Sequence, residues 1–191
     1  MRYRPEHKTE IHQKIVKDAS RRVRSEGLNG PAVATVMRDT GLTHGGFYKH
    51  FRSKEDLLVE SLREGFGEII AWLVQAAEQA RPESAWKAIV RAYLSIEHCE
   101  DPERGCPLAA LAPELARAGK DIKGQILGEM IKYKDELSRF MPGRRAADKE
   151  RAFFVIFSTM IGAVEIARML PDPIARERVL ASTRDFLLHS F

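Results

Sequence analysis

The side chains with the clearest chemical use lie close together between Thr43 and Lys54. Tyr48, Lys49 and His50 are consecutive, and Lys54 follows shortly after them. All four carry hydrogen-bond donors of the kind that bind phosphate oxygens. Donors and cations in one short stretch favour an electrostatic contact with a nucleic-acid backbone. The alternative is that Tyr48 and His50 only pack the core of a small domain.

The elements that would position these donors are two short helices and a turn, within the stretch VATVMRDTGLTHGGFYKHFRSK at residues 33–54. Apolar residues with i, i+3, i+4 spacing give the first helix one buried face: Val33, Val36 and Met37. Gly41 can adopt the positive φ of a tight turn. Thr43 is a good N-cap for a second helix that ends at His50. The pattern predicts a helix-turn-helix whose second helix enters DNA.

The second helix of this pair has an unusual composition. Gly45 and Gly46 lie inside it, where each costs about 1 kcal/mol relative to Ala. Their missing side chains would let the backbone approach a partner closely. Phe47 and Phe51, at i and i+4, would anchor the helix to a core. Base edges should be read from the start of this helix, at residues 43–46.

The segment GLTHGGFYKHFRSKEDLL, residues 41–58, resembles the DNA-binding signature of tetracycline-repressor (TetR) family regulators. The matching positions are Gly41, Thr43, Tyr48, His50, Phe51, Lys54, Glu55 and Leu58. The match is strong over roughly the first sixty residues, and beyond them it rests on length and helical pattern. The resemblance implies a homodimer that binds a palindromic double-stranded DNA operator and responds to a small-molecule inducer.

The resemblance also implies which residues face DNA: Thr43, His44, Gly45, Tyr48, Lys49, His50 and Lys54. The sequence departs from the family pattern at two nearby positions. Ala32 stands where many relatives have a hydroxyl residue, and Met37 stands where they have Ala. Thr35, one turn further along, is predicted to supply a hydroxyl near DNA instead.

The distribution of charge supports two domains with different roles. Residues 1–54 hold 12 Lys/Arg and 5 Asp/Glu, a net charge of +7. Residues 55–191 hold the other 19 basic and 22 acidic side chains, a net charge of −3. A basic head on a mildly acidic body is typical of a nucleic-acid reader, although a solvated basic surface has the same charge. We predict a helix-turn-helix DNA-binding domain at 1–54 and a ligand-binding and dimerisation domain at 55–191.

Helical periodicity continues along the whole chain and predicts an all-α, two-domain fold of nine helices. Besides the pair described above, helices are predicted at 9–26, 53–79, 84–99, 107–118, 121–141, 146–170 and 174–189. The first has an apolar stripe, and its basic residues, Arg24 among them, are assigned to the other faces. The helix that begins at Ser53 reaches from one domain into the other, so we predict that it links them mechanically.

The two helices nearest the C-terminus are predicted to form a homodimer interface. The helix at 146–170 carries more apolar residues than one stripe needs: Phe153, Phe154, Ile156, Phe157, Met160, Ile161 and Val164. Some must face the core and others a partner. Gly162 and Ala163 would allow close approach, and Phe186, Leu187 and Leu188 would add to the interface. A fully buried central helix in a monomer is the alternative.

A ligand pocket in the second domain is implied by the resemblance alone. The candidate lining residues are Phe66, Trp72, Tyr93, Tyr133, Phe154 and Phe157, all of which are also ordinary core residues by type. Cys106 precedes Pro107 at a predicted helix start, where a thiol can be activated. With Cys99 as resolving partner it would make an electrophile or oxidant sensor. The alternative is a small, inert, buried residue.

Several classes of protein are disfavoured by the sequence. There is no phosphate-binding Gly loop or nucleophile elbow, and His98, Cys99 and Cys106 have the wrong spacing for a metal. We therefore predict no enzyme activity, cofactor or metal. The absence of an apolar leader, and an apolar run at 152–164 too short for a membrane span, predict a cytoplasmic protein without a membrane partner. The predicted function is a ligand-responsive repressor; a thiol-based redox protein and a ligand-independent DNA-binding adaptor are the alternatives.

Overall fold

The computed structural model describes residues 5–28, 35–36 and 44–191. Within these ranges the chain is helical and contains no strand, which confirms the all-α prediction. Thr35 and Val36 are helical, as predicted. The described residues do not include the turn at Gly41, the predicted N-cap Thr43, or the other residues of the first helix of the predicted helix-turn-helix.

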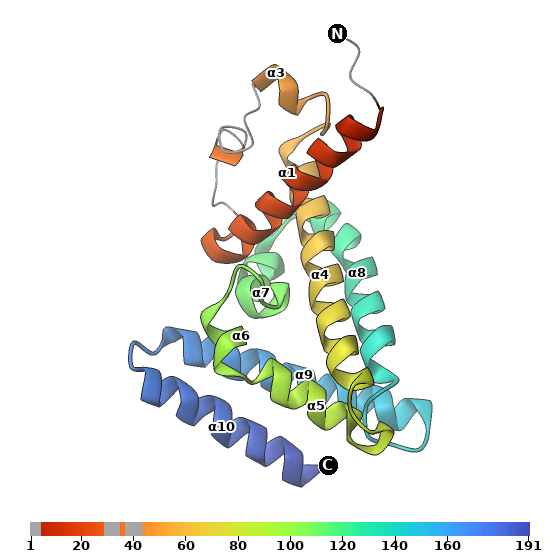
Figure 1. Cartoon of the computed structure of the whole chain (residues 1–191), viewed down its shortest axis with the longest axis vertical. Coiled ribbons are helices and arrows are strands. Elements are labelled where there is room, and N and C mark those ends of the chain that lie inside the picture. Colours follow the sequence, from red (N-terminus) through yellow and green to blue (C-terminus); the bar gives the residue numbers. More distant parts are fainter. Residues whose placement is uncertain (1–4, 29–34, 37–43) are drawn as a thin grey trace.

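The N-terminal end of the molecule has a small core of its own. It joins α1 (Pro5–Glu26) to α3 (His44–Phe47), which lie together at the top of Figure 1. Its buried side chains are Ile15, Val16, Ala19, Val36, Phe47, Phe51 and Leu57. Phe47 and Phe51 are therefore the anchors that their spacing predicts. α1 ends at Gly27, which has a φ of +88° and whose amide donates to the Val23 carbonyl at 3.0 Å.

The long helix α4 (Lys54–Glu78) runs from this small core to the far end of the molecule, beside α8 (Lys120–Ser138) (Figure 1). It begins after Ser53, as predicted, and its N-terminus is capped by side chains. Ser53 Oγ accepts a hydrogen bond from the Asp56 amide at 3.1 Å, and Asp56 Oδ2 accepts from the Arg52 amide at 3.0 Å. Leu57 belongs to the small core, whereas Leu62 and the buried residues after it belong to the larger one. One continuous helix therefore serves both cores.

The larger core lies among the remaining helices, with α9 (Ala146–Met169) and α10 (Pro173–Ser190) packed side by side across the base of Figure 1. The other elements are the short 3₁₀ turn η1 (Pro82–Ser84), α5 (Ala85–Tyr93), α6 (Ile96–Glu100) and α7 (Pro107–Arg117). The helix predicted at 84–99 is broken, so the predicted count of nine is slightly off. Ser95 causes the break because its side chain caps α6, accepting from the His98 amide at 3.2 Å.

α9 is longer than the apolar run counted in the sequence. By length and composition alone it could cross a membrane. In this fold eight of its residues are buried, and it packs against α5, α6, α7, α8 and α10. Arg168, in its last turn, donates to the carbonyls of Cys99, Ala109 and His98. These contacts are those of a central core helix.

Candidate nucleic-acid interface and regulatory core

The predicted DNA-facing end presents its donors on a firmly anchored base. Phe47 is 1% exposed, whereas the neighbouring Tyr48 is 60% exposed, and Lys49 and Lys54 are also exposed. The Tyr48 ring lies in a T-shaped arrangement with Phe47, at a centroid distance of 5.2 Å, and is not part of the small core. His44, Gly45 and Gly46 lie in α3. The arrangement gives the short helix a buried side and a donor-rich open side.

His50 is more enclosed than its neighbours and differs from them electrostatically. Burial lowers its pKa, and the nearby charges of His12, Lys8 and Lys49 lower it further. Its Nδ1 is buried without a hydrogen-bond partner in the part of the chain that is described. Its ring lies 6.0 Å from that of His12. The enclosure of the His50 ring and its contact with His12 indicate that packing accounts for part of its role.

His12 connects the small core to α4. Its Nε2 lies 2.7 Å from Glu60 Oε2, and its ring stacks on Phe51 with centroids 4.6 Å apart. This joint holds the end of α3 against α4, next to the capped N-terminus of α4. The amide groups of that N-terminus favour anions, including phosphate.

Five of the eight predicted ligand residues come together in one buried aromatic cluster. Phe66 meets Tyr133 at 6.0 Å, Tyr133 meets Phe157 at 5.2 Å, and Phe157 meets Tyr93 at 5.9 Å between ring centroids. Cys106 Sγ lies 3.9 Å from the Tyr133 hydroxyl. Phe153, which was predicted as one of the apolar residues shared between the core and a homodimer interface, completes the cluster at 4.5 Å from Phe157.

The other three predicted ligand residues lie elsewhere. Phe154 is 53% exposed on the outer side of α9. Trp72 is 37% exposed, and its ring contacts that of His98 at 5.4 Å. Cys99 is buried in α6, where its carbonyl accepts from Arg168. Residue type alone could not separate these positions, because outward and inward aromatic residues alternate along the same helices.

The aromatic cluster contains a polar atom that the fold leaves unsatisfied. The Tyr93 hydroxyl is fully buried and makes no hydrogen bond of ordinary geometry among the residues described, although the thiol of Cys106, a weak hydrogen-bonding group, interacts with it. Burial raises the pKa of both Tyr93 and Tyr133 well above the ordinary value, so both phenols stay protonated. A buried donor without an acceptor is costly and rare. It marks Tyr93 as the place where a ligand acceptor would gain most.

Both thiols are enclosed in this conformation. Cys106 occupies the predicted N-cap position of α7 but is 0% exposed, and Cys99 is 2% exposed. Burial raises the pKa of the Cys99 thiol. Arg104, which is close to Cys106 in sequence, instead donates to Asp101 Oδ2 at 2.6 Å. Reaction with an electrophile would first require local opening, so the sensor hypothesis stays a prediction.

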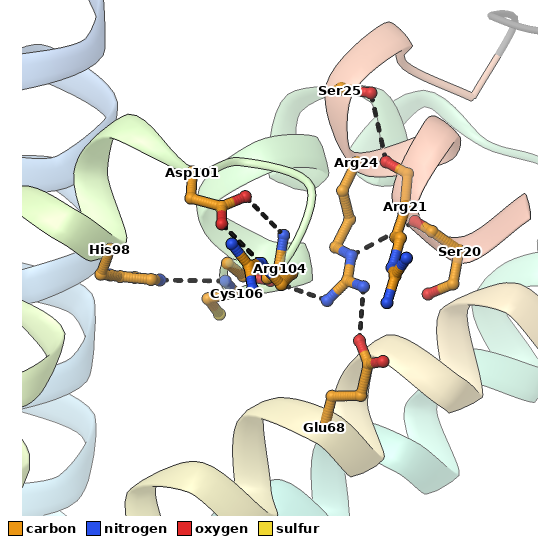
Figure 2. Close-up of polar contacts among 10 residues, drawn as sticks. Ser20, Arg21, Arg24, Ser25, Glu68, His98, Asp101, Arg104 and Cys106 are labelled. Atoms are coloured by element: carbon orange, nitrogen blue, oxygen red, sulfur yellow. Dashed lines mark hydrogen bonds and ion pairs between the residues drawn. The ribbon is translucent and has the colours of Figure 1, made fainter. Parts of the chain in front are cut away.

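A chain of hydrogen bonds leads from α1 to the aromatic cluster, and Figure 2 shows the part of it between Arg24 and His98. The Arg24 guanidinium of α1 donates to the Gly105 carbonyl at 3.1 Å and pairs with Glu68 of α4 at 2.5 Å. The Cys106 amide donates to His98 Nε2 at 3.0 Å, and His98 Nδ1 donates to the Tyr93 carbonyl at 2.7 Å. No step of this chain was predicted.

Arg24 was assigned to an outer face of its helix, and that assignment is wrong. The residue is only 4% exposed. It directly follows Val23 and lies four residues after Ser20, which is also buried. The apolar stripe of α1 widens toward its end, because α4 and α7 both contact it there. A wider stripe ending in one Arg could have been recognised as a buried cation that needs a partner.

His98 makes the stability of the fold depend on pH. Burial lowers its pKa from 6.5 to about 4. Protonation is thus easier in the unfolded chain, so the stability is fully present above pH 6.5 and is lost as the pH falls toward 4. The expected loss is about 3 kcal/mol. Denaturant titrations at several pH values would measure it, with His98→Gln as the comparison. Equal slopes for both proteins between pH 6.5 and 4.5 would contradict this assignment.

Across the described ranges, no group of three or more His, Cys, Asp and Glu side chains is placed to hold a metal ion. The side chains of these two regions offer hydrogen bonds and charges. One end offers donors to an anionic backbone, and the other offers a buried phenol in an aromatic environment.

Comparisons with known proteins agree on the architecture. No family model matches the sequence, and no curated protein matches it. Among solved structures, a TetR-family transcriptional regulator from Cytophaga hutchinsonii is similar with a TM-score of 0.78 and 19% identity, over 98% of both chains. One from Chloroflexus aurantiacus has a TM-score of 0.77 and 20% identity, over 96% of both chains.

A third similar structure contains a ligand. The regulator FadR from Bacillus subtilis, in complex with stearoyl-CoA, has a TM-score of 0.69 and 17% identity, over 94% of this chain and 99% of that one. The similarity extends over both the N-terminal and the C-terminal parts, far beyond the short signature at residues 41–58. The chain therefore has the fold of the TetR-family transcriptional regulators.

Proposed function

We propose that the protein is a homodimeric, ligand-responsive repressor that binds a palindromic DNA operator. Residues 1–54 bind DNA, and residues 55–191 bind the ligand and form the dimer. The observation that carries this proposal is the contrast between Phe47, the buried last residue of a short helix containing two glycines, and Tyr48, the exposed residue directly after it. The buried ring fixes the helix, and the exposed phenol with Lys49 and Lys54 faces outward to phosphate. A regulator of this kind acts in the cytoplasm and needs no enzyme activity.

The proposed ligand is a neutral, mainly apolar compound that carries a hydrogen-bond acceptor. It would bind among the aromatic rings of Phe66, Tyr133 and Phe157 and accept from the Tyr93 hydroxyl. The charge of Arg168 acts on Tyr93, but the Arg168 guanidinium already donates to the carbonyls of Cys99, Ala109 and His98, and both phenols stay protonated, so the cluster favours a neutral group. The similar FadR was solved in complex with stearoyl-CoA, whose acyl chain is large and apolar although its CoA part is anionic, and the acyl chain is the part that resembles the ligand proposed here.

The proposed dimer would use α9 and α10. Both helices expose large apolar side chains although their opposite faces are buried: Val155, Ile166, Met169, Ile174 and Phe186. A Cβ added at Gly162 would meet nothing within 4 Å, so this position offers open space on α9. Contiguous apolar surface of this kind marks an interaction site. A second copy also supplies the second recognition helix that an inverted repeat requires.

The proposal is tested by selecting duplexes from a random DNA library with the purified protein. We expect an enriched inverted repeat, bound with a strong salt dependence because phosphate contacts release counterions. A Tyr48→Ala/Lys49→Ala double variant should bind the enriched duplex at least about ten-fold more weakly, since it loses two phosphate contacts per subunit. Circular dichroism would show that this variant is folded. Failure of folded, dimeric wild-type protein to enrich any sequence at low salt would contradict the proposal.

The two alternatives make different predictions. A thiol-based redox protein needs an accessible thiol, whereas both cysteines are buried here. A ligand-independent adaptor has no use for an unsatisfied phenol in its core. A rise in melting temperature with an apolar compound that carries an acceptor, lost in Tyr93→Phe, would favour the ligand-responsive protein over the adaptor.

A further inference from the structure

The peptide bond between Gly105 and Cys106 is held from both sides by different parts of the molecule. Its carbonyl accepts from Arg24 Nη1 of α1 at 3.1 Å. Its amide donates to His98 Nε2 of α6 at 3.0 Å. Figure 2 shows Arg24 and His98 on opposite sides of this loop. One rigid peptide plane therefore joins the DNA-binding end to the C-terminal domain.

We propose that this peptide is the point at which the C-terminal core sets the position of α1. We call the group formed by Arg24, Glu68, His98 and the Gly105–Cys106 peptide the α1 junction. Its biological meaning rests on the proposed function, since a repressor must pass a signal from ligand to DNA. The junction would act alongside α4, the link that the sequence predicts.

The C-terminal side of the α1 junction leads directly to the aromatic cluster. His98 Nδ1 donates to the carbonyl of Tyr93, the last residue of α5, and their rings lie 4.5 Å apart. Arg168 Nη2 donates to the His98 carbonyl at 3.0 Å. A ligand that draws the Tyr93 side chain toward itself would move His98, and with it the acceptor of the Cys106 amide.

On the N-terminal side of the α1 junction, the hydrogen bonds of Arg24 depend on the position of the Gly105–Cys106 peptide. Arg24 is buried, and its donors go to the carbonyls of Ser20 and Gly105 and to the Glu68 carboxylate. Losing the Gly105 carbonyl would leave a buried guanidinium N–H without a partner, which is strongly disfavoured. If the loop that carries Gly105 is displaced slightly, α1 is therefore expected to move with it, because this keeps the hydrogen bond between Arg24 and the Gly105 carbonyl.

The packing around the α1 junction leaves little room for other adjustments. A Cβ at Gly105 would lie 2.9 Å from Arg168 Nη2 and 3.1 Å from the Asp101 carbonyl oxygen. A Cβ at Gly65 of α4 would lie 3.1 Å from Pro107 Cγ and 3.2 Å from Ser20 Oγ. α7 adds a second contact, from Glu114 Oε2 to the Leu28 amide at 2.8 Å. A movement of the loop at residues 101–107 or of α7 would thus move the C-terminal end of α1 as well.

The test is a double-variant cycle read by hydrogen–deuterium exchange on the free, full-length protein. His98→Asn keeps an amide near the Nδ1 position but cannot reach the Cys106 amide. We expect about ten-fold faster exchange both at residues 101–107 and at the end of α1, residues 22–28. In an Arg24→Met background, His98→Asn should still accelerate the loop but should have no further effect on α1. His98→Gln, whose amide can reach the Cys106 amide, should restore slow exchange.

Two controls separate the α1 junction from general loosening. Glu68→Gln keeps an acceptor for Arg24 and the Gly105 bond, so the effect of His98→Asn on α1 should persist. Arg63→Met removes another ion pair of α4, from the half-exposed Arg63 to Glu129 of α8 at 3.0 Å, and should leave the effect of His98→Asn on α1 unchanged. If His98→Asn accelerates exchange at residues 22–28 equally with and without Arg24, or not at all, the α1 junction carries no signal and the proposal is wrong.

A second measurement separates this inference from the proposed function. With the enriched duplex bound, wild-type residues 101–107 should exchange several-fold more slowly, since coupling is reciprocal. Arg24→Met should bind the duplex without this protection. Unchanged protection in Arg24→Met would overturn the α1 junction while leaving the repressor intact. Failure to bind any duplex would overturn the repressor, and the cycle in the free protein would still decide the α1 junction.

Discussion

Replacing Phe186 by Glu is expected to convert the proposed dimer to monomers and to weaken operator binding about 100-fold or more. Phe186 is 66% exposed on α10, next to the fully buried Leu187. In a symmetric dimer each copy would bury one such ring, which contributes about 2 kcal/mol per side chain. The substitution removes this contribution twice and places two carboxylates in an apolar interface, where their desolvation is costly.

The measurement pairs light scattering, which gives the mass in solution, with the anisotropy of a labelled duplex. Leu127→Glu is the matched control, because Leu127 is 55% exposed and apolar but lies on α8. It should leave both mass and affinity unchanged. A Phe186→Glu protein that remains dimeric would show that α10 is not in the interface. A monomer with unchanged affinity would show that a single recognition helix suffices.

The positions at which helices begin and end could be predicted from the sequence wherever a single side chain determines them. Ser53 starts α4, Gly27 ends α1 and Pro107 opens α7, because caps, positive φ and a missing N–H act within a few residues. The anchors Phe47 and Phe51 were predicted for the same reason, since i, i+4 spacing fixes a shared face. The all-α fold follows from many such local choices that agree with one another.

Long-range contacts could not be predicted in the same way. Arg24 is buried by helices that lie about forty and eighty residues further along the chain. Phe154 and Phe157 have the same character in the sequence, yet one is 53% exposed and the other is 2% exposed. Only the placement of neighbouring helices separates them. The predicted ligand residues therefore include both members of the aromatic cluster and surface residues. The predicted DNA-facing residues, in contrast, all belong to one local sequence motif.

Replacing Phe47 by Ala is expected to unfold the DNA-binding end while the C-terminal core stays folded. Phe47 is 1% exposed in a small core to which the described residues contribute seven buried side chains, and α3 has four residues, two of them Gly. Removing a buried ring typically costs about 3–5 kcal/mol. So small a core cannot absorb that loss, and operator binding should fall at least about 100-fold. Hydrogen exchange would show rapid exchange in α3 and the first half of α1, with α5 to α10 still protected.

Tyr48→Ala is the matched control, because it removes the neighbouring aromatic ring from an exposed position. Its stability should stay within about 0.5 kcal/mol of wild type, while its affinity for the duplex falls. The pair therefore separates loss of DNA contacts from loss of the domain that presents them. Because α4 contributes Leu57 to the small core and Leu62 to the large one, some protection should also be lost in the first turns of α4. Loss of protection throughout α5 to α10 in Phe47→Ala would mean that the two cores unfold as one, and residue 54 would not then mark a boundary between independently stable domains.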